Sequence, residues 1–227
     1  MSYIWQDFNI KPFPAETIVF RDGLFCPEIS TLESPVISKN YDLPVHYIYV
    51  GNLSGHNVLN IDINENVKNQ KIFLSVNVKI ENITDFEIVI KNSGMDSNIT
   101  CFIVLENYGN LTYNIYAHNL CRKTGILVKN RLLAYKNSVS KLNGVANIYK
   151  YCEDCNSNIE FSAMAEKDAK IIFSPQQKIS AEPGFAAHST NIARPNDQQI
   201  EYLHGAGLTD PEILSVMREA FITNPDF

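Results

Sequence analysis

The chain lacks an excess of positive charge. Its 19 Lys and Arg residues are outnumbered by 25 Asp and Glu residues, which gives a formal net charge of −6 over 227 residues. A protein that binds nucleic acid needs a basic surface to neutralise phosphate groups. The composition therefore argues against a nucleic-acid partner.

Long hydrophobic segments are absent as well. No apolar run approaches the roughly 20 residues that a helix needs to cross a bilayer. The opening residues Met1 to Asp7 carry neither a basic region nor an apolar core, as a secretion signal would. Five cysteines are an odd number, which favours reduced thiols over a disulfide framework. We therefore expect a cytoplasmic protein that does not engage a membrane.

Several catalytic motifs are also missing. The sequence has no Gly-x-x-x-x-Gly-Lys-Ser/Thr phosphate loop, so the chain is not expected to hydrolyse ATP. It has neither a Gly-x-Ser-x-Gly nucleophile turn nor a His-Glu-x-x-His zinc motif. The sequence therefore predicts a protein that is not an enzyme.

What the sequence does contain, from residue 44 to residue 187, is a series of short alternating segments. Asn, Gly, Asp and Ser fill the gaps between them and supply turn chemistry. The segments recur about every ten to fifteen residues without a helical pattern between them, which fits a sandwich, a barrel or a β-solenoid. The clearest apolar members are Val76, Val78 and Ile80; Phe86, Ile88 and Ile90; Cys101, Ile103 and Leu105; and Leu111, Tyr113 and Ile115.

Two helices are predicted near the end of the chain. Asn196 or Asp197 can cap the first, and Gly205 and Gly207 can end it. A capping-box spacing then starts the second helix at Thr209. Its apolar face consists of Ile213, Leu214, Met217 and Phe221. We expect these helices to cover one end of the strand region.

The chain thus divides into three parts. Residues 1–43 hold an N-terminal arm and the first strands, residues 44–194 form the β core, and residues 195–227 form a helical segment. The arm itself, residues 1–14, is expected to be extended because it contains two prolines and scattered aromatic residues.

One pair of cysteines has metal-ligand spacing. Cys152 and Cys155 stand two residues apart and can share one metal ion, although a closed zinc or iron site normally needs four ligands. The other three cysteines, Cys26, Cys101 and Cys121, are isolated in sequence. Two readings stay open at this point, a labile metal site and a polar turn that holds two thiols.

The C-terminal region resembles the SufB/SufD family, whose members are scaffold subunits of iron–sulfur cluster assembly. The order is a strand, Ala-x-His, a polar stretch, Asp-Gln-Gln-apolar-x-Tyr-Leu, Gly-apolar, Asp-Pro-Glu and a helix that ends in Ala-Phe. The segment from Ile18 to Ser30 is similar to another family segment, so the resemblance runs from about Ile18 to Phe221. The matching C-terminal positions are His188, Gln199, Tyr202, Leu203, Gly207, Leu208 and Phe221.

This resemblance implies a fold, a site and partners. The fold is a right-handed parallel β-helix, a single-stranded solenoid. The resemblance implies that His188 takes part in cluster assembly at a subunit interface. Imidazole is a common ligand for iron. The helical segment is implied to dock a SufC-like ABC ATPase. The apolar residues available for docking, or for packing within the chain, are Tyr202, Leu208, Ile213, Met217 and Phe221.

The sequence also departs from the family pattern. The residues before Ile18 leave no room for the larger helical domain with which family members usually begin, so we do not expect that domain here. Glu160 stands near the position of the SufB-type cysteine. Ser189 replaces the glutamate that follows the histidine in SufB-like subunits, which favours the SufD side. Glu201 and Ala206 replace the usual Phe and Arg. We therefore expect no cofactor held stably by the isolated chain, but a transient cluster shared with a SufB-like subunit or a second copy.

Two other functions remain open. One is a β-solenoid interaction module without an assembly role, which would bind no SufC-like ATPase. The other is a carbohydrate-active β-helix, in which Glu65 or Asp85 would pair with Glu87 in a carboxylate-lined groove.

Overall fold

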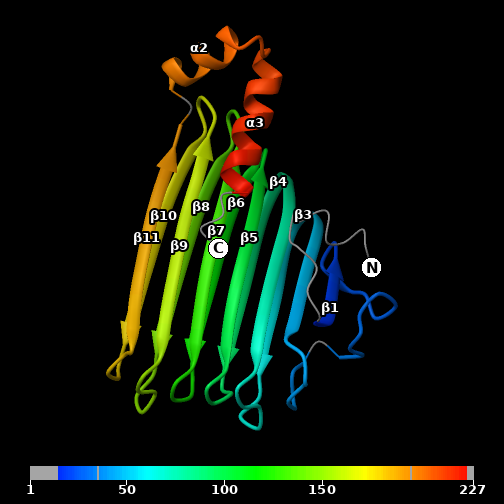
Figure 1. The fold of residues 1–227 in the computed structure, drawn as a ribbon, viewed down its shortest axis with the longest axis vertical. Helices are drawn as coiled ribbons and strands as arrows, with labels where there is room; N and C mark the ends of the chain where they lie inside the picture. The colour runs from blue at the N-terminus through cyan, green and yellow to red at the C-terminus, as the bar shows by residue number, and fades with distance from the viewer. Residues whose placement is uncertain (1–14, 35, 195, 224–227) are drawn as a thin grey trace.

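The computed structural model describes residues 15–34, 36–194 and 196–223, so the predicted arm at residues 1–14 lies outside the described residues. The predicted parallel β-helix with a short C-terminal helical segment is confirmed, with about six turns of parallel sheet followed by two helices (Figure 1). The strands are β1 (Glu16–Arg21), β2 (Leu24–Phe25), β3 (Val45–Ile63), β4 (Lys71–Asn92), β5 (Asn98–Asn107), β6 (Asn110–Asn119), β7 (Gly125–Ala134), β8 (Val139–Ile148), β9 (Asn156–Ala165), β10 (Lys170–Ile179) and β11 (Phe185–Ala193). The helices are α2 (Asp197–Gly205) and α3 (Asp210–Thr223).

The solenoid has two long faces. β3 and β4 each run through both faces, and the later strands alternate between them. β5, β7, β9 and β11 stack in parallel on the first half of β4 and form the first face. β6, β8 and β10 stack on its second half and form the second face. Residues paired between neighbouring turns are 27 to 31 positions apart in sequence, which is the length of one turn.

Alternate side chains of every turn point inward and stack on the same position of the next turn. All the alternating apolar residues that the sequence singled out are buried in this interior. An aromatic column runs through it, with neighbouring ring centroids 5.5 to 6.4 Å apart from Tyr49 through Phe86, Tyr113 and Phe161 to Phe173. Buried aromatic pairs at these separations contribute beyond the area that they bury.

Buried asparagines close the turns at both edges of the solenoid. The Asn92 side-chain amide donates to the backbone oxygen of Ser97, and its carbonyl accepts from the backbone N–H of Gly94. Asn107 has the corresponding role at the opposite edge. Its side-chain amide donates to the Ser140 hydroxyl at 2.7 Å, and its side-chain carbonyl accepts from the backbone N–H of Gly109. Because buried backbone groups need partners, these side chains allow tight turns without loss of hydrogen bonds.

The helix boundaries agree with the predicted caps. The Asn196 side chain accepts from the Gln199 backbone N–H at 2.7 Å, and the Gln199 side chain bonds back to the Asn196 N–H. At the start of α3 the Glu212 carboxylate accepts from the Thr209 backbone N–H at 2.8 Å. Gly207 has a φ of +91°, a conformation that glycine adopts without strain.

The expected cap over one end of the solenoid is wrong. α2 lies beyond the edge at which the first-face strands end, and α3 runs back over the ends of β7 and β9 (Figure 1). Neither helix covers the last turn, made by β10 and β11. The reason is the packing of α3, whose Met217 and Phe221 contact Leu133, Tyr135 and Met164 of the first face.

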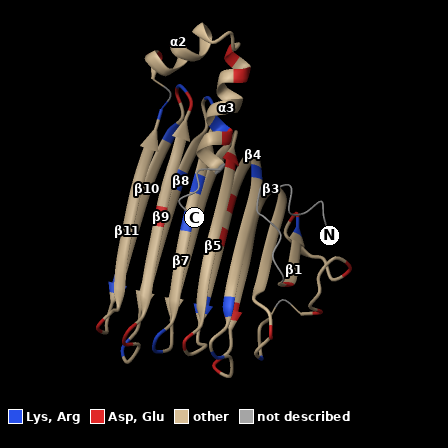
Figure 2. Ribbon diagram, in the orientation of Figure 1, with Lys and Arg blue, Asp and Glu red and all other residues tan. Residues whose placement is uncertain are grey.

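Charged residues gather in the turns and on the helices, while the long strands carry few (Figure 2). Within the described part of the chain, no helix is both long and apolar enough to cross a bilayer.

Candidate functional site

His188 lies in the last strand, at the uncovered end of the solenoid. It pairs in register with Ile159 of β9, whose side chain is buried in the core. In-register neighbours of a parallel sheet point to the same side, so the His188 side chain faces the interior side of the last turn. It is nevertheless exposed, because the described chain adds no further turn above it.

We call this end the open mouth and define it by the inward positions of the last turn. These are His188, Thr190 and Ile192 of β11, with Phe173 and Gln177 of β10. Phe173 stacks on Phe161 of the preceding turn, with ring centroids 5.5 Å apart. The Gln177 Nε2 atom is buried and has no hydrogen-bond partner among the described residues. The open mouth therefore has an apolar base and three polar side chains, those of His188, Thr190 and Gln177, and the nitrogen atoms of the imidazole and the amide can bind a further group.

The last turn exposes several large apolar side chains. Ile192 faces the open mouth, whereas Phe185 and Ile172 pair in register with the outward Asn156 and Lys141 and lie on the outer faces. The exposed fractions of these three apolar side chains run from 46% to 55%. β10 and β11 are the terminal strands of the sheet, so each pairs with a neighbour on one side only. Soluble proteins normally protect such edges, since unpaired backbone groups and exposed apolar side chains promote pairing with another sheet. This edge has the chemical character of a strand-pairing surface.

The predicted thiol pair lies elsewhere, on the inner side of the turn between β8 and β9. Cys152 and Cys155 are buried together with Ile148, beneath Ala181 and Ala186 of the last turn. Among the described residues, no group of three or more His, Cys, Asp and Glu side chains is placed to hold a metal ion. The structure thus does not bring His188 and the two thiols together into one site.

A third cysteine, Cys121, lies next to this pair. The sequence did not predict that Cys121 would be close to it. The Cys155 Sγ lies 3.0 Å from the backbone oxygen of Cys121 and 3.2 Å from the Thr124 hydroxyl. Cys121 and Cys152 are one turn of the solenoid apart in sequence, and only the turn length could have indicated their proximity.

The five residues predicted for partner docking separate into two groups. Ile213 is buried, and Met217 and Phe221 pack against the solenoid, so these three hold α3 in place. Tyr202 is 77% exposed on α2, and Leu208 is half-buried in the connection to α3. α2 itself has no buried residue. Val216 is also exposed on α3, although sequence reasoning did not select it.

Two arginines fix the helical segment to the turn between β9 and β10. The Arg218 guanidinium lies 3.2 Å from the Glu166 carboxylate and 4.2 Å from the centre of the Tyr135 ring. Arg194 donates to the backbone oxygens of Glu166 and Ala169 at 3.1 and 3.3 Å. These contacts hold α3 and the chain that enters α2 against the solenoid.

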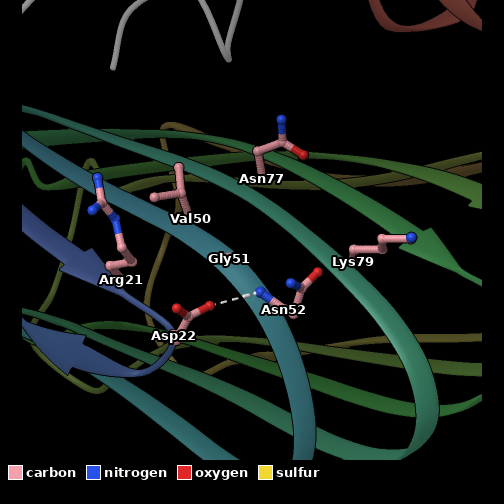
Figure 3. Close-up of a pocket in the computed structure, with 7 residues that line it drawn as sticks. All are labelled: Arg21, Asp22, Val50, Gly51, Asn52, Asn77 and Lys79. Atoms are coloured by element: carbon pink, nitrogen blue, oxygen red, sulfur yellow. Dashed lines mark hydrogen bonds between the residues drawn. The ribbon is translucent and has the colours of Figure 1, made fainter. Parts of the chain in front are cut away.

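A polar cleft of about 430 Å³ lies at the other end of the solenoid (Figure 3). Arg21 and Lys79 contribute positive charge to it, and Asp22 contributes a carboxylate. The Asp22 carboxylate accepts from the Asn52 backbone N–H at 2.8 Å, and Lys79 pairs with Glu81 at 2.7 Å. The cleft therefore has mixed charge that is already partly neutralised, and it selects no ligand class.

The carboxylates considered for carbohydrate chemistry do not lie in this cleft. Asp85 and Glu87 occupy alternate positions on the outward side of β4, and the inward Phe86 separates them. Glu65 follows β3 at the opposite edge of the solenoid, near the turn into β4. Glu65 is thus not paired with the other two acids.

No family model matches the chain, and no curated protein matches it either. The features of the chain that bear on function are the geometry of the open mouth, the helical segment and the resemblance of their residues to the SufB/SufD pattern.

Proposed function

We propose that this chain is a non-enzymatic scaffold subunit of iron–sulfur cluster assembly. It works with a SufC-like ABC ATPase, which docks on the helical segment, and with a second solenoid at the open mouth, either a SufB-like subunit or another copy of this chain. The cluster is the cargo of the complex rather than a cofactor of the isolated chain. The sequence features behind the proposal are the His188 motif and the helices that follow it.

The position of His188 is the observation that carries the proposal. A histidine that served only the core would be buried and bonded within the chain, whereas this one is exposed on the last strand. Ile192 and Phe173 of the open mouth are apolar, so a partner that covered the open mouth would exclude water from the imidazole. A neutral imidazole in such a place is a suitable ligand for iron.

One imidazole cannot hold a cluster. Iron–sulfur clusters are usually held by four protein ligands, most often thiolates. Among the described residues, His188 belongs to no group of three or more His, Cys, Asp and Glu side chains that could hold a metal ion. The remaining ligands must come from the partner, which would pair its own strands with the open edges of β10 and β11.

The helical segment offers the surface for the ATPase. Tyr202 projects from a helix that the solenoid does not cover, and Val216 and Leu208 extend the apolar surface toward α3. Exposed tyrosines are frequent energetic centres of protein interfaces because they bury a large area at a small entropic cost. The arginine contacts to Glu166 fix the position of this surface before the ATPase binds.

We expect His188→Ala to lower the yield of cluster about tenfold, because loss of one metal ligand weakens the shared site. The measurement is iron and sulfide content after anaerobic co-expression with a SufB-like subunit and the ATPase. The variant complex should still co-purify, since one imidazole is a small part of such an interface.

His56→Ala is the matched control, because His56 is also an exposed histidine on a strand but lies far from the open mouth. It should leave the cluster yield unchanged. Equal cluster content in wild type and His188→Ala would refute the assembly role. A full-strength cluster on the wild-type chain alone would refute the need for a partner.

We expect Tyr202→Asp to weaken binding of a SufC-like ATPase about 30-fold, since a charge replaces a central apolar contact. The affinity can be measured by titration calorimetry with the purified ATPase. The control is Tyr151→Asp, because Tyr151 is 70% exposed but lies at the opposite edge of the solenoid. Undiminished binding by Tyr202→Asp with folding intact would remove the docking surface from the proposal.

The exposed apolar side chains of the last turn also favour a second candidate, a solenoid interaction module without an assembly role. Such a module would pair through β10 and β11 and use neither His188 nor the ATPase. The two experiments separate the candidates, because the module predicts a stable complex in which both substitutions have no effect.

A further inference from the structure

Two neighbouring turns at one edge of the solenoid bring three thiols together. Residues 120–124 connect β6 to β7, and residues 149–155 connect β8 to β9. The turns stack directly, because the Lys123 N–H donates to the Glu153 oxygen at 3.0 Å and the Asn156 N–H donates to the Thr124 oxygen at 2.8 Å. Stacked strands lie about 4.8 Å apart, which falls within the range of Cα–Cα separations that a disulfide bond spans.

The thiols differ in access. Cys121 is half-buried, whereas Cys152 and Cys155 are buried. Cys155 donates from Sγ to the Cys121 backbone oxygen, which places the two residues in direct contact. Burial raises the pKa of the Cys152 thiol, and the neighbouring thiols of Cys155 and Cys121 raise it further. A reagent from solution therefore reaches Cys121 first.

We propose that Cys121 is the entry point of a thiol–disulfide exchange site and forms a disulfide across the two turns, with Cys152 or Cys155 as its partner. This inference is independent of the proposed function. It also explains the Cys-x-x-Cys spacing in a different way. In this explanation the two buried thiols do not bind a metal together; either one can attack the mixed disulfide on Cys121, which lies one turn earlier.

The exchange balances with a small disulfide such as oxidised glutathione as the oxidant. The Cys121 thiolate attacks one sulfur of glutathione disulfide, forms a mixed disulfide and releases one glutathione thiolate. The buried thiol then loses its proton to solvent and attacks the Cys121 sulfur, which releases the second glutathione. Two protein thiols are oxidised, and one glutathione disulfide is reduced to two glutathione molecules.

The bond would fasten the end of the solenoid. A disulfide from Cys121 to Cys155 joins residues 34 positions apart and closes a loop that contains β7 and β8. The buried thiols pack beneath Ala181 and Ala186, so the disulfide bond would lie just below the turn that leads to β11. Closing such a loop restricts the unfolded chain and slows opening of the last turns.

The test uses the full chain, first reduced and then incubated with oxidised glutathione. Free thiols are alkylated, and peptides are mapped by mass spectrometry without reduction. The expected product is a peptide of Cys121 joined to a peptide of Cys152 or Cys155, with a thermal midpoint raised by about 5 °C that returns to its initial value with dithiothreitol. Cys121→Ser should abolish both effects.

Cys26→Ser is the control, because Cys26 is also half-buried but lies near β2 at the other end of the chain, and it should keep the cross-turn product. A bond between Cys152 and Cys155 as the main product would overturn the proposal. So would glutathione that stays on Cys121 without resolution by either buried thiol.

Discussion

Replacing Phe161 with alanine is expected to lower the free energy of unfolding by about 3 to 5 kcal/mol. The Phe161 side chain is almost completely buried and joins the aromatic column to the open mouth. Its ring meets Tyr113 edge-on, with centroids 6.4 Å apart, and stacks on Phe173 at 5.5 Å. Truncation removes both ring contacts and leaves a cavity in the last turns.

The cavity cannot collapse easily, because of Gly144. A Cβ atom at Gly144 would lie 2.8 Å from the Phe161 ring and 3.1 Å from the Ile159 side chain. The ring therefore occupies the space that a side chain on the second face would otherwise fill. With glycine opposite, residue 144 has no side chain that could move into the space after truncation.

This complementarity gives a double-mutant test. Gly144→Ala alone should destabilise the chain by about 1 to 3 kcal/mol, because the methyl group overpacks the site. In the Phe161→Ala background the same methyl group should partly fill the cavity, so the double variant should be more stable than the sum of the single effects predicts. Urea unfolding followed by circular dichroism measures all four proteins. Additive effects would show that the two positions do not share the space.

The solenoid interior was predictable because its pattern is local. Val76, Val78 and Ile80 alternate with polar residues, and the same period-two pattern recurs in each later turn. The continuity of β4 was not predictable in this way. The chain stays extended through residues 81–85 and bends from one face to the other without a loop, so two predicted strands are one. The exposed residues at this bend are of the types found in turns, so the sequence alone predicts two strands with a turn between them.

The position of the helices depends on contacts that are distant in sequence. Caps at Asn196 and Thr209 are local features, and the sequence identified both. The apolar face of α3 was also recognised, but a face does not specify what it contacts. Met217 and Phe221 contact Tyr135, more than 80 residues earlier, and this contact places α3 beside the strand edge and leaves the last turn open.

In the candidate site, too, local features could be predicted from the sequence, whereas contacts between distant residues could not. The motif around His188 marked the residue, but only the register with Ile159 reveals that the imidazole faces the open mouth. The acidic turn between Cys152 and Cys155 was evident in sequence, whereas its contact with Cys121 depends on turns of unequal length. A solenoid with a strict repeat would have made that contact predictable.

Acidification from pH 6.5 to pH 4 is expected to destabilise the fold by about 3 kcal/mol through His46 alone. His46 lies in β3 and is buried, with its Nε2 atom 2.8 Å from the Ser75 hydroxyl and its ring edge-on to Phe73. Burial lowers the pKa of His46 to about 4, against an ordinary value of 6.5. The folded chain therefore keeps this imidazole neutral in a range where the unfolded chain binds a proton.

The sign of the effect follows from this difference. Above pH 6.5 both states hold a neutral imidazole, so His46 contributes no dependence on pH. As the pH falls from 6.5 to 4, only the unfolded state gains the proton, and stability decreases. Below pH 4 both states are protonated, and the contribution of His46 levels off.

The measurement compares wild type with His46→Gln, because the glutamine amide retains a hydrogen-bonding group near Ser75 but does not titrate. Urea unfolding at intervals between pH 7 and pH 4 gives the free energy of unfolding of each protein. Carboxylates that titrate near pH 4 affect both proteins alike, so the difference between the two curves isolates His46. We expect the wild type to lose about 3 kcal/mol more than the variant over this range. Parallel curves for the two proteins would mean that the buried imidazole is protonated in the folded chain as readily as in the unfolded one.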